Sequence, residues 1–79
     1  MPTVLRIDEH RFFFYSNEGN EPPHIHVETG ANTAKFWLRP VALADSYDYN
    51  SRTLGELTRI VRNHSDVFEE KWDEFFGSD

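Results

Sequence analysis

The chain has 79 residues, a formal charge of −6 at pH 7 and no cysteine. A chain of this length suits one domain, so residues 1–79 are expected to form a single domain. The lack of cysteine excludes disulfides, thiol catalysis and cysteine-ligated zinc. The negative charge disfavours nucleic acid as a partner without excluding it, because such binding depends on neutralising phosphates.

The chain also lacks the signals of export and of membrane insertion. Residues 1–6 do not combine a basic segment with a long apolar run, and no stretch approaches the roughly 20 apolar residues of a spanning helix. We therefore expect a cytoplasmic protein with no membrane partner.

Two strands and a loop are expected in the first third of the chain. Residues 4–7 and 12–15 are apolar runs joined by the polar residues 8–11, a hairpin-length connection. Residues 16–23 are rich in Asn, Gly, Glu and Pro and predict a loop. The paired prolines at its end hold the backbone extended as it approaches the next strand.

That next strand, residues 24–28, alternates polar and β-branched side chains. Residues two positions apart share a face of a strand, so His24, His26 and Glu28 are expected on one side and Ile25 and Val27 on the other. The apolar side predicts burial against a core. The two histidines are the candidate functional centre, since imidazole titrates near neutral pH and binds metals.

The pairing of this strand with residues 33–38 follows from burial. If Ile25 and Val27 are to face the same core as Phe36 and Ala34, residue 25 must pair with 36 and residue 27 with 34. The turn then centres on Gly30-Ala31, and glycine at the first central position suits a type II′ hairpin turn.

This register has a consequence for the outer face of the sheet. His24 should lie opposite Trp37, and His26 opposite Lys35. Pro40 is expected to interrupt the fourth strand, with residues 41–44 resuming it as a short edge segment before a polar loop at residues 45–50.

The second half of the chain predicts two helices. Ser51 or Thr53 can cap the first, and the second begins near Ser65 or Asp66 and ends at Gly77. The residues at helical spacing are Leu54, Leu57, Ile60, Val61 and His64 in the first helix, and Phe68, Trp72, Phe75 and Phe76 in the second. Two helices packed on one face of a four- to five-stranded antiparallel sheet give an α+β fold.

Several short segments together carry a family resemblance. They are Met1-Pro2-Thr3, Phe12-Phe13-Phe14-Tyr15, Pro22-Pro23-His24-Ile25-His26-Val27, Ala34-Lys35-Phe36-Trp37-Leu38, Pro40-Val41, and His64 with Trp72. In these segments the chain resembles the bacterial family catalogued as domain of unknown function 4160. The resemblance covers nearly the whole chain, and the Pro-Pro-His-x-His element is its most specific part.

What the resemblance implies is a small cytoplasmic protein of a family with no settled activity. Members are often encoded beside another small domain, domain of unknown function 2442, in an arrangement reminiscent of toxin and antitoxin pairs. The resemblance therefore implies a small protein partner encoded nearby.

The candidate site residues are His24, His26 and Lys35 as catalytic groups and Trp37, Arg39 and Glu28 as ligand-binding groups. We predict no cofactor and no resident metal. Three functions remain open, and the one that the resemblance implies, and that we favour, is an interaction or regulatory component of a two-gene toxin–antitoxin-like module.

The other two functions use the histidines directly. A metal-independent ribonuclease or phosphodiesterase would use His24 and His26 as acid and base while Lys35 holds the phosphate. A metal-binding protein would add a third ligand from Glu28, His10 or His64. The structural alternative is a histidine pair that hydrogen-bonds loop backbone and packs against Trp37.

Overall fold

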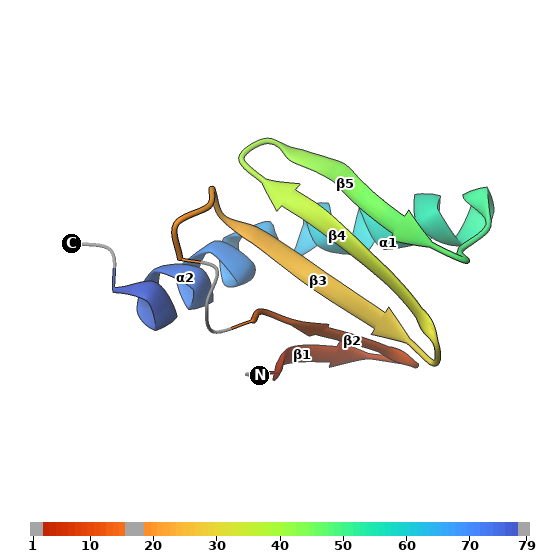
Figure 1. Cartoon of the computed structure of the whole chain (residues 1–79), viewed down its shortest axis with the longest axis horizontal. Coiled ribbons are helices and arrows are strands. Elements are labelled where there is room, and N and C mark those ends of the chain that lie inside the picture. The colour runs from red at the N-terminus through yellow and green to blue at the C-terminus, as the bar shows by residue number, and fades with distance from the viewer. Residues whose placement is uncertain (1–2, 16–18, 78–79) are drawn as a thin grey trace.

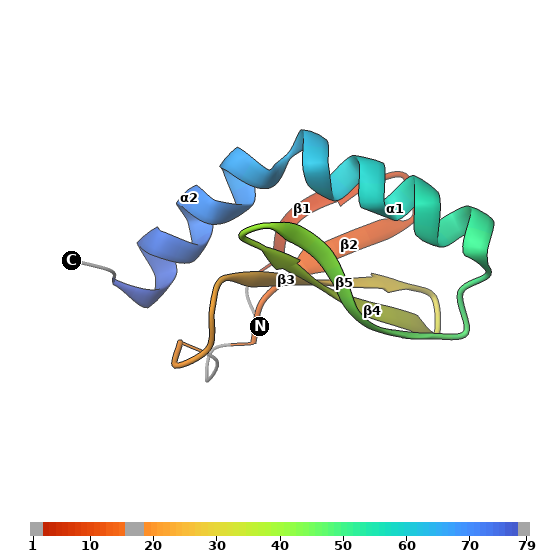
Figure 2. The same ribbon diagram turned by 90° about the horizontal axis from the view of Figure 1, so that it is seen from above.

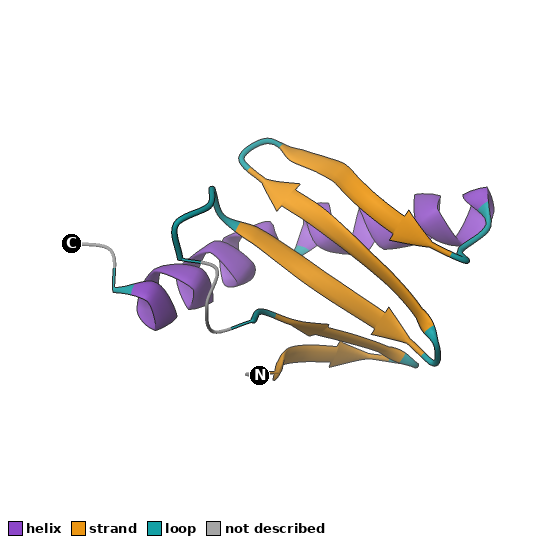
Figure 3. Ribbon diagram, viewed as in Figure 1, coloured by secondary structure: helices purple, strands orange, loops and turns teal. Residues whose placement is uncertain are grey.

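The computed structural model describes residues 3–15 and 19–77. Five strands come first, β1 (Thr3–Ile7), β2 (His10–Phe13), β3 (His24–Thr29), β4 (Asn32–Leu38) and β5 (Val41–Tyr47), and two helices follow, α1 (Ser51–Asn63) and α2 (Ser65–Phe76). The strands form one antiparallel sheet in the order β1-β2-β3-β4-β5, each beside its neighbour in sequence (Figure 1). Figure 3 shows the strands and then the helices in separate colours. This is the α+β fold that the sequence predicts.

Both helices lie along the same face of the sheet (Figure 2). The core lies between the helices and the sheet. Its buried members are Phe12, Phe14, Ile25, Val27, Ala34, Phe36, Leu38, Leu57, Val61, Phe68 and Trp72. The rings of Phe12 on β2 and Phe68 on α2 stack with centroids 5.3 Å apart. Burying a side chain of this size stabilises the fold by about 1.5 to 3 kcal/mol. Neither α1 nor α2 covers the opposite face of the sheet, which we call the open face (Figure 2).

The register of the central hairpin is confirmed. Ile25 pairs with Phe36 and Val27 with Ala34, and the ladder runs on to Thr29 opposite Asn32. The connection is the two-residue turn Gly30-Ala31, in which Gly30 has a φ of +59°. A primed hairpin turn requires this left-handed conformation at its first central position, and glycine adopts it without steric cost.

The first hairpin is tighter than predicted. β2 begins at His10 instead of Phe12, and the turn reduces to Asp8-Glu9, with Asp8 at a φ of +54°. His10, expected in the polar connection, is buried, and its Nδ1 lies 2.7 Å from Thr29 Oγ1. The hydroxyl of Tyr49 donates to the same Thr29 oxygen at 2.8 Å. These hydrogen bonds explain why β2 includes His10, a polar residue that the sequence assigned to the connecting turn.

β5 differs from the prediction in both length and direction. It runs from Val41 to Tyr47 instead of ending at Ala44, and it turns back antiparallel to β4 instead of resuming it. The Arg39-Pro40 peptide bond in the turn is cis. An edge strand tolerates polar residues because one of its sides faces solvent, so Asp45 and Tyr47 continue the strand where polarity suggested a loop.

The helix ends follow local hydrogen bonding. The N-cap of α1 is Asn50, whose Oδ1 accepts from the Thr53 backbone N–H at 2.8 Å, so the predicted caps Ser51 and Thr53 are wrong. α2 begins at Ser65 as predicted, and Gly77 closes it in the left-handed conformation. No helix among the described residues is long and apolar enough to cross a membrane.

Candidate functional site

The open face carries a row of chemically varied side chains across four adjacent strands. Phe13 of β2 pairs with His26 of β3, His26 with Lys35 of β4, and Lys35 with Asp45 of β5. Because Ile25 and Val27 point into the core, the alternation of the strand directs His26 away from it. The predicted neighbours His26 and Lys35 are thus brought together.

A hollow of about 220 Å³ lies over this row. The side chains that shape it include Phe13, Tyr15, His26, Lys35, Asp45 and Tyr47. Ligand pockets for drug-sized molecules usually measure about 300 to 1,000 Å³, so this hollow is of a size for one side chain or a small group.

His26 is the histidine that borders the hollow. Its ring stacks on Phe13 with centroids 5.5 Å apart and meets Tyr15 edge-on at 4.8 Å. The side chain is half-buried. These aromatic neighbours hold the imidazole at the border of the hollow.

His24 has a different environment although it belongs to the same face by register. It is fully buried, and its Nδ1 donates to the Pro22 carbonyl at 2.9 Å. Its ring lies 4.8 Å from Trp72 of α2 and 5.7 Å from Trp37 of β4, centroid to centroid. Sequence alternation placed His24 on the outer face, but the tryptophan of α2 and the preceding loop cover it. The expected packing against Trp37 and bonding to loop backbone are both present at His24.

Lys35 lines the hollow, and its charge is paired within the protein. Its Nζ lies 2.8 Å from Glu21 Oε1 and 4.5 Å from the centroid of the Trp37 ring. The ammonium group is therefore paired with a carboxylate from the loop before β3.

The three ligand-binding candidates, Trp37, Arg39 and Glu28, are not among the residues that line the hollow. Arg39, in the turn between β4 and β5, pairs with Glu69 of α2 at 2.8 Å, and this hydrogen bond and the Glu69 charge raise the pKa of Arg39. Glu28 accepts from Arg11 Nε at 2.9 Å across the β2–β3 pair. Arg39 and Glu28 are both engaged in ion pairs on the protein's own surface.

Sequence reasoning missed the far wall of the hollow. Asp45 and Tyr47 were assigned to a loop, yet they are alternate residues of β5 and lie opposite Lys35 and Thr33. The Tyr47 hydroxyl donates to Asp45 Oδ2 at 3.1 Å, and this bond together with the Asp45 charge raises the pKa of Tyr47. Extending the ladder of β4 by alternation would have found both.

Of the three proposed additional metal ligands, Glu28 shares the open side with His26 but is bonded to Arg11, and the other two lie apart from it. His10 bonds to Thr29, and the Nδ1 of His64 donates to the Ile60 carbonyl at 3.0 Å. Within residues 3–15 and 19–77, no three His, Asp or Glu side chains gather closely enough to hold a metal ion.

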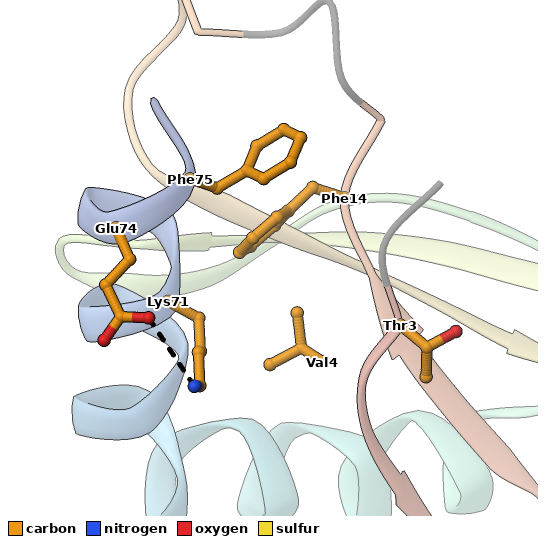
Figure 4. Close-up of a pocket in the computed structure, with 6 residues that line it drawn as sticks. All are labelled: Thr3, Val4, Phe14, Lys71, Glu74 and Phe75. Carbon is orange, nitrogen blue, oxygen red and sulfur yellow. Dashed lines mark ion pairs between the residues drawn. The ribbon is translucent and has the colours of Figure 1, made fainter. Parts of the chain in front are cut away.

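A second concavity, of about 360 Å³, lies beside α2 (Figure 4). Its apolar walls are Val4 of β1, Phe14 after β2, and Phe75 of α2, which is half-exposed. At its rim Lys71 Nζ stands 3.6 Å from Glu74 Oε1. None of the site residues predicted from the sequence lines this groove.

The comparisons with known proteins bear on the family alone. A search of the curated proteins found no match, and a search of the solved structures found none either. A family described as "Domain of unknown function (DUF4160)" matches residues 10–73, a span that includes the histidine strand, Lys35 and both residues of the far wall. The match covers well over half of the chain, and the chain therefore belongs to the DUF4160 family.

Proposed function

We propose that this protein is the interaction component of a two-protein, toxin–antitoxin-like regulatory module, and that it binds its partner with the open face of the sheet. One observation carries the proposal. The sheet face that α1 and α2 leave uncovered presents an aromatic hollow, which is flanked by Tyr15 at 40% exposure and Tyr47 at 60%.

The composition of the open face supports this use. The solvent side of an antiparallel sheet is normally polar, whereas this one also carries Phe13, Trp37 and Tyr47. Tyrosine, tryptophan and arginine are the residues that most often dominate binding energy at protein interfaces. Arg11 is a further residue of this kind on the open face, and its guanidinium lies 4.2 Å from the centroid of the Phe13 ring.

The same geometry argues against a phosphodiesterase that uses both histidines. His24 is fully buried, so a substrate in the hollow can meet only His26. The Lys35 ammonium is paired with Glu21, and the Asp45 carboxylate would repel a phosphate placed beside it. An acid and base pair needs two groups within reach of the substrate.

The test is co-expression with the small protein encoded next to this gene and measurement of the dissociation constant. Tyr47→Ala and Tyr15→Ala should each weaken binding about 30-fold, as expected for loss of a contact worth about 2 kcal/mol. Both tyrosines are exposed, so folding should change little. Phe75→Ala, which removes an exposed aromatic ring on α2 beside the other groove, is the matched control and should leave binding unchanged.

The opposite pattern would overturn the proposal. If Phe75→Ala weakens binding and the tyrosine variants do not, the partner docks in the groove beside α2. If the parent protein instead cleaves RNA without added metal and His26→Gln abolishes the cleavage, the phosphodiesterase alternative replaces the interaction function.

A further inference from the structure

The hollow on the open face contains a carboxylate that forms no ion pair with any cation of residues 3–15 and 19–77. Asp45 accepts a hydrogen bond from Tyr47, and in the described part of the chain no Lys, Arg or His side chain forms an ion pair with it. Lys35 is its direct neighbour across the β4–β5 pair, but the ammonium group of Lys35 is bonded to Glu21 at 2.8 Å. The hollow therefore presents negative charge at its β5 wall.

The aromatic rings of the open face already accept cations from within the protein. The Arg11 guanidinium lies 4.2 Å from the centroid of the Phe13 ring, and the Lys35 ammonium lies 4.5 Å from that of Trp37. Cations are attracted to the faces of aromatic rings by the ring quadrupole. Of the rings that border the hollow, Tyr47 is the most exposed, at 60%.

We propose that the hollow binds an arginine side chain of the partner protein. The guanidinium donates to the Asp45 carboxylate, and its planar surface lies against the rings of Tyr47 and His26. This assignment rests on the proposed function and names the chemistry that the partner must present.

Arginine fits these walls better than other side chains of similar length. Its planar fork can donate two parallel hydrogen bonds to one carboxylate and can stack on an aromatic ring, whereas lysine offers a compact, strongly hydrated charge. The hollow, at about 220 Å³, is also below the usual range of about 300 to 1,000 Å³ for drug-sized ligands. A chain with a net charge of −6 further favours a basic partner.

The proposal can be tested with short peptides and the isotope-labelled full chain. The probes are acetyl-Gly-Arg-Gly-amide and the same peptide with citrulline, which keeps the shape of arginine and removes its charge. The arginine peptide should shift the amide resonances of His26, Asp45 and Tyr47 and bind about tenfold tighter than the citrulline peptide, as a charge-assisted hydrogen bond predicts.

A pair of variants makes the test specific to the carboxylate. Asp45→Asn should reduce the affinity for the arginine peptide to that for the citrulline peptide. Glu56→Gln removes an exposed carboxylate from α1 on the helix side of the sheet and should leave both affinities unchanged. The amide spectrum of each variant reports directly whether the fold is retained.

Three results would overturn the arginine assignment: equal affinity for the two peptides, no effect of Asp45→Asn, or shifts in the hollow caused by sodium phosphate and not by the arginine peptide. If any of these occurs while Tyr47→Ala still weakens partner binding about 30-fold, the interaction function stands and only the assignment of arginine fails. If Tyr47→Ala leaves partner binding intact as well, both proposals fail.

Discussion

Replacement of Trp72 by alanine should remove the main contact between α2 and His24, the first residue of β3. The Trp72 side chain is 5% exposed, and its ring lies 4.2 Å from Phe76, 4.8 Å from His24 and 5.4 Å from Phe14, centroid to centroid. It thus joins a helix, the loop after β2 and the start of β3. No other ring on α2 contacts His24 among the described residues.

The expected loss follows from the size of the cavity. Truncation of a buried Phe or Trp to Ala costs about 3 to 5 kcal/mol. A small domain has about 5 to 15 kcal/mol of total stability, so the variant keeps a reduced margin or unfolds. Since 1 kcal/mol shifts the melting temperature of a domain of this size by about 4 to 8 °C, the loss corresponds to about 12 to 40 °C.

The assay is thermal unfolding followed by circular dichroism, with Phe75→Ala as the control from the same helix. Phe75 is 45% exposed, so its truncation should cost only about 1 kcal/mol. A Trp72→Ala protein that melts within a few degrees of the parent, or no lower than Phe75→Ala, would show that Trp72 does not anchor the core.

Three further predictions concern local contacts. Asn50→Ala removes the N-cap of α1 and should lower the midpoint of urea unfolding by the equivalent of about 1 kcal/mol, whereas Asn50→Asp keeps a capping oxygen and should leave the midpoint unchanged. Equal midpoints for Asn50→Ala and the parent protein would contradict the capping role of Asn50. Gly19→Ala should cost about 1 to 3 kcal/mol in thermal unfolding, because an added Cβ would stand 2.6 Å from Phe76 Cδ1; an unchanged melting temperature would mean that the loop yields freely. Asp45→Asn should lower the pKa of Tyr47 toward its ordinary value in an NMR titration, because it weakens the hydrogen bond that the Tyr47 hydroxyl donates and removes the negative charge that disfavours the tyrosinate. An unchanged pKa would refute the Tyr47–Asp45 bond.

The central hairpin could be predicted from the sequence because two independent constraints agree there. The alternation of Ile25 and Val27 fixes which side is buried, and Gly30 fixes the turn, so a slip of one residue would violate both. The neighbours of His26 and Lys35 on the open face follow directly from that register.

The burial of His24 could not be predicted because it depends on contacts between distant parts of the chain. Alternation assigns His24 to the outer face, but Trp72, which comes 48 residues later, covers the ring, and the Pro22 carbonyl accepts from it. His24 becomes buried and differs from His26, which borders the hollow, only when Trp72 of α2 packs against it.

The far wall of the hollow was missed for a different reason. Asp45 and Tyr47 lie on an edge strand, where one side faces solvent and polar residues carry no strand signal. Local composition at residues 45–50 resembles a loop, and only pairing with β4 selects the extended conformation.

The most direct test of the open face as the proposed partner-binding surface is chemical-shift mapping of the labelled protein with the proposed partner, a small protein encoded nearby. We predict that the amide shifts concentrate at Tyr15, His26, Lys35 and Tyr47, with little change along the exposed side of α2. Shifts confined to Lys71, Glu74 and Phe75 would contradict this account.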